Sequence, residues 1–452
     1  MNKNMIPEST SRSEHADNNA IGQRMYVLAN ELFPICRSIT GNGVRETFAI
    51  LARELPGLQV HEVTTGTQCF DWTIPNEWNV SEAYIATMEG KRVLDFKDSN
   101  IHLVGYSEPI DKIISRADLD AHLHSRPDLP DAIPYVTSYY RRNWGFCLSH
   151  NQRQLLQDAN YHVKVVSTLA PGSLTYADLI IPGESPEEIL VSTYVCHPSM
   201  GNNETSGVVV ATELARFVLG LPKRRYTYRF VFVPETIGAV AYISQHLGNL
   251  KRCVIAGFVQ TCVGDDRTYS FMPSRNGNTL ADRVAKHVLE RVLGTQYSAY
   301  SFLDRGSDER QYCSPGVDLP VVSVMRSKYG TYPEYHTSLD NMGLISPSGL
   351  FGGYLANRRC IECLEVNETL KATVICEPFL SPRGLRPPLV NGVVMPDWAR
   401  NVSNVLAYAD GDMDLIAMAD VFQMSVFELV PIIQKLKECG LLVRAASPDG
   451  SS

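Results

Sequence analysis

The spacing of apolar residues changes along this chain, and each change marks a new region. Over residues 21–55 they recur every three or four positions, which predicts two helices on either side of the turn at 41–43. Residues 1–20 are polar, so a disordered tail is expected there. From about 160 to 370, short apolar runs alternate with segments of helical period. That alternation is typical of an α/β fold with a mostly parallel sheet.

The alternating region also indicates where a site would lie. The predicted strands cover 161–169, 187–196, 226–234, 251–260 and 319–325, and the predicted helices cover 206–221 and 278–294. In such sheets, binding sites form at the carboxyl ends of the strands. Polar residues that directly follow these apolar runs are therefore the first candidates for function.

Residues 63–162 show a different pattern, with short alternating runs separated by Pro, Asn and Gly. This pattern predicts small strands, and the proline-rich aromatic stretch 125–146 predicts an ordered loop. We therefore expect an inserted, small β-rich domain over 63–162. The α/β core would then comprise residues 21–62 and 163–370. The inserted domain could shape a pocket or form a dimer interface, and a homo-oligomer stays open.

The C-terminal residues 371–452 predict helices, a turn and a short strand, which is the pattern of a winged-helix module. From Arg400 to Arg444 there are four basic and six acidic residues. A module that reads DNA should be net positive to engage phosphates. We therefore expect a packing or protein-contact role for this module, and no nucleic-acid partner.

Composition narrows the class of protein. Hydrophobic residues make up 44% of the 452 residues and the net charge is −8, which argues against a general polyanion binder. No apolar run is long enough to span a membrane, and no signal peptide is evident. The 11 cysteines are an odd number and are scattered, as expected for reduced thiols. A cytoplasmic protein without a membrane partner is expected.

Three stretches place polar residues at predicted strand ends. His197 follows the run 187–196, with Glu204 in the turn beyond it, and Glu235 follows the run 226–234. His336 lies in an aromatic loop after the last predicted strand. Each residue alone has a simpler explanation: a hydrogen-bonded histidine, or a carboxylate favoured at the N-terminus of a helix. Their shared position at one sheet edge favours function.

Two imidazoles and a carboxylate, with water in the fourth position, form an open catalytic zinc site. A further carboxylate that does not bind the metal can act as general base on that water. We therefore expect one zinc ion per chain bound to His197, Glu204 and His336, with Glu235 as the base. Asp265 and Asp266 could bind a substrate amine, or they could be solvated loop acids.

The order of these motifs resembles the zinc aminopeptidases that carry two co-catalytic metals. From about residue 22 the chain more closely resembles a family of bacterial aminopeptidase-like proteins. These combine an inserted small β domain, a peptidase-like core and a C-terminal winged helix. The matching stretches are FPICRSITGNGVRET, FDWTIPNEWNV, IPYVTSYYRRNWGF, CHPSMGNNETSG, PETIG, GSDERQYCSPG and YPEYHTSLDN. The resemblance implies an α/β, zinc-aminopeptidase-like fold and is less specific about the reaction.

The chain departs from the two-metal enzymes at acidic positions. Their bridging acid aligns with Asn203, their second glutamate with Thr236 and a later aspartate near Thr261. Asparagine and threonine are poor replacements for carboxylates that bridge two dications, so we expect a single metal. Its binding by Glu204 requires the turn to present this side chain in place of Asn203.

The resemblance also implies residues that support the site: Asp308, Arg310, Asn203 and Tyr335. Asp308 could orient His336, and Arg310 could bind a substrate carboxylate, or the two could form a local salt bridge. The predicted function is a zinc-dependent hydrolase that cleaves an amide or peptide-like bond of a small-molecule or peptide-like substrate. The alternatives are a non-catalytic ligand-binding or scaffold protein, and a zinc-dependent acyl transferase or cyclase.

Overall fold

The computed structural model describes residues 8–386 and 396–445. It contains two compact units: residues 1–277 with 298–355, and residues 278–297 with 356–452. The first unit holds every candidate site residue named above. The predicted domain boundaries at 62, 162 and 370 stay predictions.

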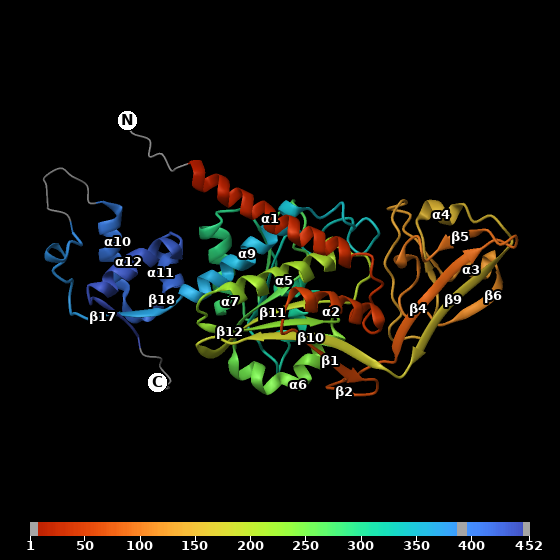
Figure 1. The fold of residues 1–452 in the computed structure, drawn as a ribbon, viewed down its shortest axis with the longest axis horizontal. Coiled ribbons are helices and arrows are strands. Elements are labelled where there is room, and N and C mark those ends of the chain that lie inside the picture. Colours follow the sequence, from red (N-terminus) through yellow and green to blue (C-terminus); the bar gives the residue numbers. More distant parts are fainter. Residues whose placement is uncertain (1–7, 387–395, 446–452) are drawn as a thin grey trace. The chain divides into compact units, whose positions relative to one another are not determined.

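The first unit is built around one eight-stranded mixed sheet (Figure 1). Its strands, in spatial order, are β1 (Gln59–Thr64), β10 (Ser173–Ile181), β12 (Tyr226–Val233), β11 (Ser185–Tyr194), β13 (Val254–Gln260), β16 (Val321–Met325), β14 (Ser270–Met272) and β15 (Ser298–Ala299). The four central strands, β12 to β16, are mutually parallel, while β1, β10 and β14 pair antiparallel. The parallel strands are buried and apolar because helices cover both faces.

Helices connect the parallel strands in two directions. The chain runs from β11 through α5 (Ser206–Gly220) to β12 on one side, then through α6 (Ile237–Cys253) to β13 on the other. Since such crossovers are right-handed, opposite directions place the two helices on opposite faces. Figure 1 shows α5 and α6 on either side of the sheet. The carboxyl ends of β11 and β12 therefore form a topological switch point, where open sheets have their crevice.

Further helices of this unit flank the sheet or end its loops. They are α1 (Glu8–Leu32), α2 (Asn42–Glu54), a π-helical turn η2 (Gly201–Thr205), η4 (Phe302–Asp304), α8 (Glu309–Tyr312) and the start of α9 (Pro347–Val366). α1 is helical from Glu8, although a disordered tail is predicted over residues 1–20. The helix that the apolar spacing predicts from residue 21 therefore begins earlier, within the polar segment.

A second, smaller sheet lies in the segment 63–170. Its order is β5 (Arg92–Asp95), β4 (Glu77–Ala86), β9 (Asn160–Ala170) and β6 (Ile110–Ser115), all antiparallel. The shorter elements are β2 (Gln68–Cys69), β3 (Trp72–Thr73), η1 (Asn100–His102), α3 (Arg116–Asp120), β7 (Leu123–His124), β8 (Phe146–Cys147) and α4 (His150–Gln154). The small strands predicted for this region are present, and residues 125–145 form a loop as predicted.

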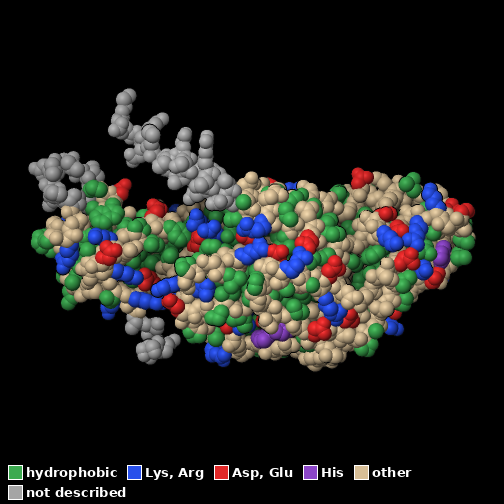
Figure 2. Space-filling model, in the orientation of Figure 1, with side chains coloured by type: hydrophobic (Ala, Val, Ile, Leu, Met, Phe, Trp, Pro, Cys, Tyr) green, Lys and Arg blue, Asp and Glu red, His purple; other side chains and the backbone are tan. Residues whose placement is uncertain are grey.

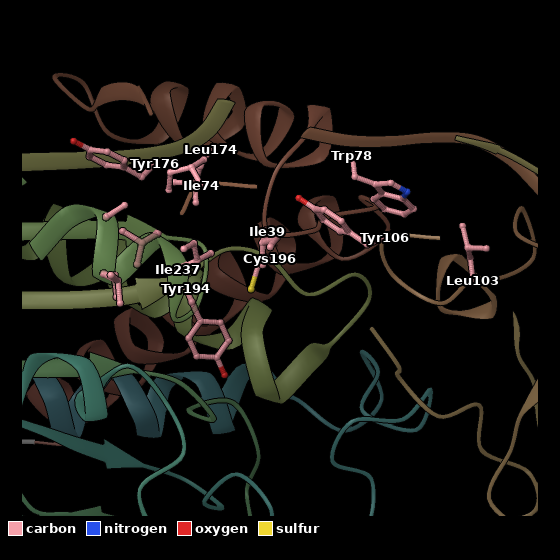
Figure 3. Close-up of a cluster of buried hydrophobic side chains, with 14 of the residues drawn as sticks. Ile39, Ile74, Trp78, Leu103, Tyr106, Leu174, Tyr176, Tyr194, Cys196 and Ile237 are labelled. Atoms are coloured by element: carbon pink, nitrogen blue, oxygen red, sulfur yellow. The ribbon is translucent and has the colours of Figure 1, made fainter. Parts of the chain in front are cut away.

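One apolar cluster joins the two sheets of the first unit. It runs from Trp78 and Tyr106 beside the small sheet to Tyr194, Cys196 and Ile237 at the central sheet (Figure 3). All five side chains are less than 5% exposed. Continuous packing of this kind transmits the position of one sheet to the other, so loops from both can line one cavity.

The second unit is a small α/β module. It contains α7 (Leu280–His287), η3 (Val288–Val292), the end of α9, β17 (Thr369–Ala372), η5 (Ser381–Arg383), α10 (Asp397–Tyr408), β18 (Asp410–Asp414), α11 (Leu415–Val421), α12 (Val426–Glu438) and β19 (Leu442–Arg444). Ser425 caps α12 in a capping box. Arg283 and His287 of α7 pair with Asp414 and Asp420, which places this helix with the C-terminal module although its sequence was grouped with the core.

Two sequence expectations differ from the structure in detail. β10, whose residues SLTYADLII lack clear alternation, was not predicted; it is buried on both faces over most of its length. Residues 251–253 end α6 and do not start β13.

In the described ranges, no single helix has the length and hydropathy to cross a bilayer, and only α11 with α12, bent by 113°, qualify as a pair. The face in Figure 2 intersperses basic and acidic side chains.

Candidate active site at the switch point

The strand order brings two candidate residues to one edge. The last residues of β11 and β12, Tyr194 and Val233, are paired in parallel register. His197 and Glu235 follow them directly in the chain, and His336 enters from the loop after β16. The separation between Nε2 of His197 and Oε2 of Glu235 is 3.7 Å. The sequence prediction that these three residues gather at one sheet edge therefore agrees with the geometry.

A cavity of about 310 Å³ opens at this edge. Its polar lining comes from His197, Glu235, Thr236, Arg310 and His336. Its remaining walls are mainly aromatic and come from Ile39, Trp72, Tyr135, Thr137, Tyr139, Tyr140 and Cys196. The aromatic side chains lie in the segment that separates the small sheet's strands and in the β2–β3 hairpin, so the inserted segment shapes the pocket, as one of its two predicted roles requires.

His197 is held by a buried carboxylate. Its Nδ1 donates to Oε2 of Glu204 at 2.8 Å, and the backbone N–H groups of Cys196 and His197 donate to the same oxygen. Burial opposes a charged imidazole, but the hydrogen bond and charge of Glu204 outweigh it and raise the pKa of His197. With Nδ1 fixed in this way, Nε2 is the nitrogen that faces the cavity.

Glu204 itself is neutralised by Arg37. Nε of Arg37 donates to Oε1 of Glu204 at 2.7 Å, and both side chains are at most 1% exposed. Burial would raise the pKa of Glu204, but the Arg37 guanidinium and His197 lower it below its usual value. Glu204, predicted as a metal ligand, is not among the residues that line the cavity. The π-helical turn η2 directs its side chain toward Arg37, and both of its oxygens are occupied.

His336 presents an unpaired nitrogen. Its ring stacks on Tyr335 with centroids 4.0 Å apart, and its centroid lies 5.3 Å from that of His197. Nε2 is buried and has no hydrogen-bond partner. Burial and the nearby charge of His197 lower the pKa of His336 to about 3. His336 is therefore a neutral imidazole, and the tautomer with its proton on Nδ1 leaves a lone pair on Nε2 that suits a metal ligand.

Glu235 is the carboxylate of the cavity lining, and its Oε2 lies 3.7 Å from Nε2 of His197. Its pKa is raised, chiefly by burial and against the opposing charges of His197 and Arg310. Its backbone N–H donates to Sγ of Cys196 at 3.3 Å. The next residue, Thr236, has φ of 65°, an unfavourable value for a β-branched side chain. His336 is also left-handed, with φ of 55°. Such strain is concentrated at functional sites.

The predicted supporting residues act differently from expectation in one case. Asp308 accepts from the backbone N–H of Thr236 at 2.8 Å and has no contact with His336, so it supports the Glu235 loop. Burial, and then the charge of Glu235, raise its pKa well above the usual value. Arg310 donates to the Thr236 hydroxyl. Arg310 and Asp308 form no ion pair within 4.0 Å in the described residues.

Asn203 and Thr261, two of the positions where the resemblance to two-metal enzymes implies acids, form hydrogen bonds with Tyr194 and with each other. The Tyr194 hydroxyl contacts the carbonyl oxygen of Asn203 at 2.8 Å, Nδ2 of Asn203 at 2.7 Å and Oγ1 of Thr261 at 2.7 Å. Thr261 also donates to the Asn203 carbonyl at 2.9 Å. Sequence reasoning missed Tyr194, because a tyrosine inside an apolar strand gives no local signal of this role.

One cluster in the described residues has three ligand atoms within 4.8 Å of one another, from Cys196, His197 and Glu204. Its Nδ1–Oε2 and Sγ–Nδ1 separations, 2.8 and 3.2 Å, are those of hydrogen bonds. Burial and the charge of Glu204 raise the pKa of Cys196 well above normal, whereas a metal requires the thiolate. This cluster therefore fits a zinc ion poorly. The Nε2 atoms of His197 and His336 are the remaining candidate ligands, although with Glu235 they form no second group of three ligand atoms within 4.8 Å of one another in the described residues.

Comparison with known proteins agrees with this fold. A family described as a domain of unknown function, DUF4910, matches residues 26–367, and a winged helix-turn-helix family matches residues 368–444. A Clostridium acetobutylicum protein is 43% identical over 88% of this chain and 91% of its own length. It is provisionally named a polysaccharide biosynthesis protein with an aminopeptidase-like domain.

Solved structures give the same picture. A crystal structure from Clostridium acetobutylicum, provisionally described as a peptidase, is 39% identical, with a TM-score of 0.89 over 97% of this chain and 100% of that chain. A Bacillus subtilis zinc aminopeptidase is 15% identical, with a TM-score of 0.55 over 76% of this chain and 95% of that chain, and shows the fold alone. The predicted aminopeptidase-like core and C-terminal winged helix are confirmed, and the chain belongs to the DUF4910 family.

Proposed function

We propose that this chain is a metal-dependent hydrolase that cleaves an amide or peptide-like bond. The observation that carries the proposal is the convergence of three groups on one cavity: Nε2 of His197, Nε2 of His336 and the Glu235 carboxylate. Two imidazoles at a strand-end crevice can bind a metal ion, and a carboxylate beside them can act as general base. The peptidase-like fold supports hydrolysis in general.

One zinc ion per chain would be held by His197 and His336 through their Nε2 atoms. Its chemistry, when bound, is to polarise a water molecule and the scissile carbonyl. Glu204 takes a different part from the one the sequence suggested. It fixes the ring of His197 through Nδ1, as carboxylates behind metal-binding histidines do, while Arg37 holds Glu204 in place.

Glu235 would accept the proton of the attacking water and return it to the leaving amine. A raised pKa suits this task, because a base works best when its pKa lies near the working pH. The aromatic walls would exclude bulk water from the reacting atoms.

A second candidate function, a non-catalytic ligand-binding or scaffold protein, is favoured by one observation. Asn203 and Thr261 stand where the resemblance to two-metal enzymes implies acids, and the Tyr194 hydroxyl forms hydrogen bonds with both. The unpaired Nε2 of His336 argues for the hydrolase, because a degenerate site is free to acquire partners for its buried polar atoms.

Metal analysis of the purified chain separates the two functions. We expect about one zinc per chain, bound by the two imidazoles, with loss of zinc in His197→Ala and His336→Ala. His162→Ala is the matched control, because His162 lies on β9 and lines no part of the cavity. A screen of amide substrates with the zinc-loaded protein then tests turnover. Absence of bound zinc after zinc is supplied would favour the scaffold.

A further inference from the structure

Arg310 is a cation in the cavity wall, and its charge acts on Glu235 without a direct ion pair in the described residues. It lies in the short helix α8, and one of its terminal nitrogens donates to the hydroxyl of Thr236. Its Nε is buried and has no partner. No carboxylate lies within 4.0 Å of it in the part of the chain that the structure describes. By contrast, the buried Arg229 is paired with Glu188 through two hydrogen bonds.

Each of the two acids nearest to Arg310 in sequence has one oxygen bound to other partners, and its second oxygen, Oδ2 of Asp308 or Oε2 of Glu309, is buried without a hydrogen bond. Oε1 of Glu309 accepts from the N–H groups of Gly306 and Ser307 and from the Tyr329 hydroxyl. Asp308 accepts from the backbone N–H of Thr236. A guanidinium with a buried, unused N–H in a cavity wall is costly unless an anion from outside meets it. The fork of N–H groups matches a carboxylate.

The cavity offers little to a substrate ammonium group. Among its lining residues, Glu235 is the single carboxylate, and it faces His197. Asp265, a candidate for binding an amine, lies outside the lining, and its oxygens accept from Asn202, from the N–H of Arg267 and from Ser327. The local charge therefore favours a substrate with a negative group beside the scissile bond over one with a free amine.

The rest of the lining sets the size and character of the attached group. Trp72 and Tyr140 meet edge to face with centroids 5.7 Å apart, and Tyr139 packs against Tyr140 at 6.2 Å. Tyr135 contacts both histidines, with centroids 5.1 and 5.3 Å away. Aromatic walls of this kind bind a flat or apolar side chain.

We propose that Arg310 forms a carboxylate subsite, and that the substrates are amides with a free carboxylate next to the scissile bond, such as N-acyl amino acids with an aromatic side chain. This inference rests on the proposed function for the position of the scissile bond. The carboxylate binds the guanidinium, the aromatic group lies against the tyrosines, and the amide faces His197 and Glu235. Specificity of this kind is opposite to that of an enzyme that recognises a free N-terminal amine.

A binding measurement tests the subsite without requiring turnover. Calorimetry would compare N-acetyl-L-tyrosine with N-acetyl-L-tyrosine amide, which lacks the carboxylate, on the full chain carrying Glu235→Gln to prevent hydrolysis. We expect the acid to bind at least about tenfold more tightly, as a charge-assisted pair implies. In the same background, Arg310→Gln should weaken the binding of the acid about 10- to 100-fold, and the affinity for the amide should stay unchanged.

Two variants complete the experiment. Arg310→Lys retains a charge but loses the fork, so it should recover part of the preference for the acid. Arg305→Gln is the control, because Arg305 is exposed five residues earlier and lies outside the cavity lining. Equal affinities for acid and amide, including no measurable binding of either, would overturn the subsite, as would a preference that survives Arg310→Gln.

The subsite and the hydrolase fail in different ways. If the chain binds the acid through Arg310 but holds no zinc and turns over no amide, the subsite stands and the hydrolase does not. If it hydrolyses amides without regard to a carboxylate, and Arg310→Gln changes nothing, the hydrolase stands and the subsite is overturned. Melting temperatures of the Arg310 variants show whether each one is folded.

Discussion

Two neighbouring parts of the site use their polar groups in opposite ways: the cavity side, with Glu235, Arg310 and His336, and the Tyr194 side, with Asn203 and Thr261. On the cavity side, Nε2 of His336 and Nε of Arg310 are buried without partners, and Glu235 stands 3.7 Å from His197. On the other side, the hydroxyls of Tyr194 and Thr261 satisfy each other and the Asn203 backbone, with Oδ1 of Asn203 alone left over. Buried polar groups without hydrogen bonds cost folding free energy, so their concentration on the cavity side indicates a binding site for a ligand or metal ion.

Glu235→Gln should give the largest effect and tests whether the cavity side is catalytic. The amide keeps the shape of the side chain but cannot accept a proton, so turnover should fall about 10²- to 10⁴-fold. Zinc content and melting temperature should stay unchanged. The control is Glu187→Gln, because Glu187 is an exposed glutamate near the start of β11, the strand after which His197 follows. Loss of zinc together with activity would contradict the assignment of Glu235 as base.

Arg37→Ala tests whether the support behind His197 is structural. It leaves Glu204 buried without its counter-charge, and breaking a buried pair in this way costs about 3–5 kcal/mol of folding free energy. Urea unfolding measures the loss. The control is Arg24→Ala, whose partner is Glu213 but whose side chain is 47% exposed, so the expected cost is below about 1 kcal/mol. Similar costs for the two variants would show that burial of the Arg37 pair contributes nothing.

The same comparison shows what the sequence could and could not predict. His197 and Glu235 were found because each ends an apolar run, and parallel strands bring such residues to one edge. Arg37 contacts Glu204 across 167 positions, and no local pattern announces such a contact. The direction of the Glu204 side chain depends on the π-helical turn η2, which spacing alone does not specify.

The fold was more predictable than the site for a physical reason. Strands such as β12 and helices such as α5 follow from the period of apolar residues, which burial imposes along the whole element. β10 escaped because it is buried on both sides and so lacks alternation. The pairing of α7 with the C-terminal module includes an ion pair of Arg283 with Asp414 and a hydrogen bond of His287 with Asp420, which only the folded chain brings together.

Asp340 gives the Tyr194 side a pH dependence of its own. It accepts from the N–H groups of Asn202 and Asn203 and from Tyr332, and burial raises its pKa from 3.8 to about 6. The folded state therefore binds more protons than the unfolded state between these values. The stability that the proton on Asp340 gives to the folded state is fully present below about pH 3.8. It is lost as the pH rises through about 6, and the loss is on the order of 3 kcal/mol.

Urea unfolding of the native chain and of Asp340→Asn measures this effect. The asparagine does not titrate, so the stability of the native chain relative to the variant should decrease between pH 4 and pH 7. Because the other carboxylates are common to both proteins, their contributions to the pH dependence of stability cancel in this comparison. A difference that stays constant over this range would show that Asp340 has an ordinary pKa.

Tyr194→Phe tests whether the hydroxyl holds its side together. The change removes one oxygen that contacts Asn203 and Thr261 and leaves their buried groups unpaired, which should cost about 1–3 kcal/mol. Tyr297→Phe is a milder control, because its hydroxyl contacts the exposed Glu290. Zinc content should be unaffected, since neither partner of Tyr194 faces the cavity. A variant that loses zinc would show that the two sides are coupled.

Asn203→Asp should change metal content least, and it asks why this side does not bind an ion. The substitution introduces the acid that the resemblance to two-metal enzymes implies at this position. The Tyr194 hydroxyl would still occupy the space between residue 203 and Thr261, and Thr261 supplies no carboxylate. Since one carboxylate is too few for a dication, we expect zinc to stay at about one per chain, while the buried charge lowers stability. A second zinc ion in this variant would mean that the missing acid alone, and not the tyrosine hydroxyl, keeps this side free of metal.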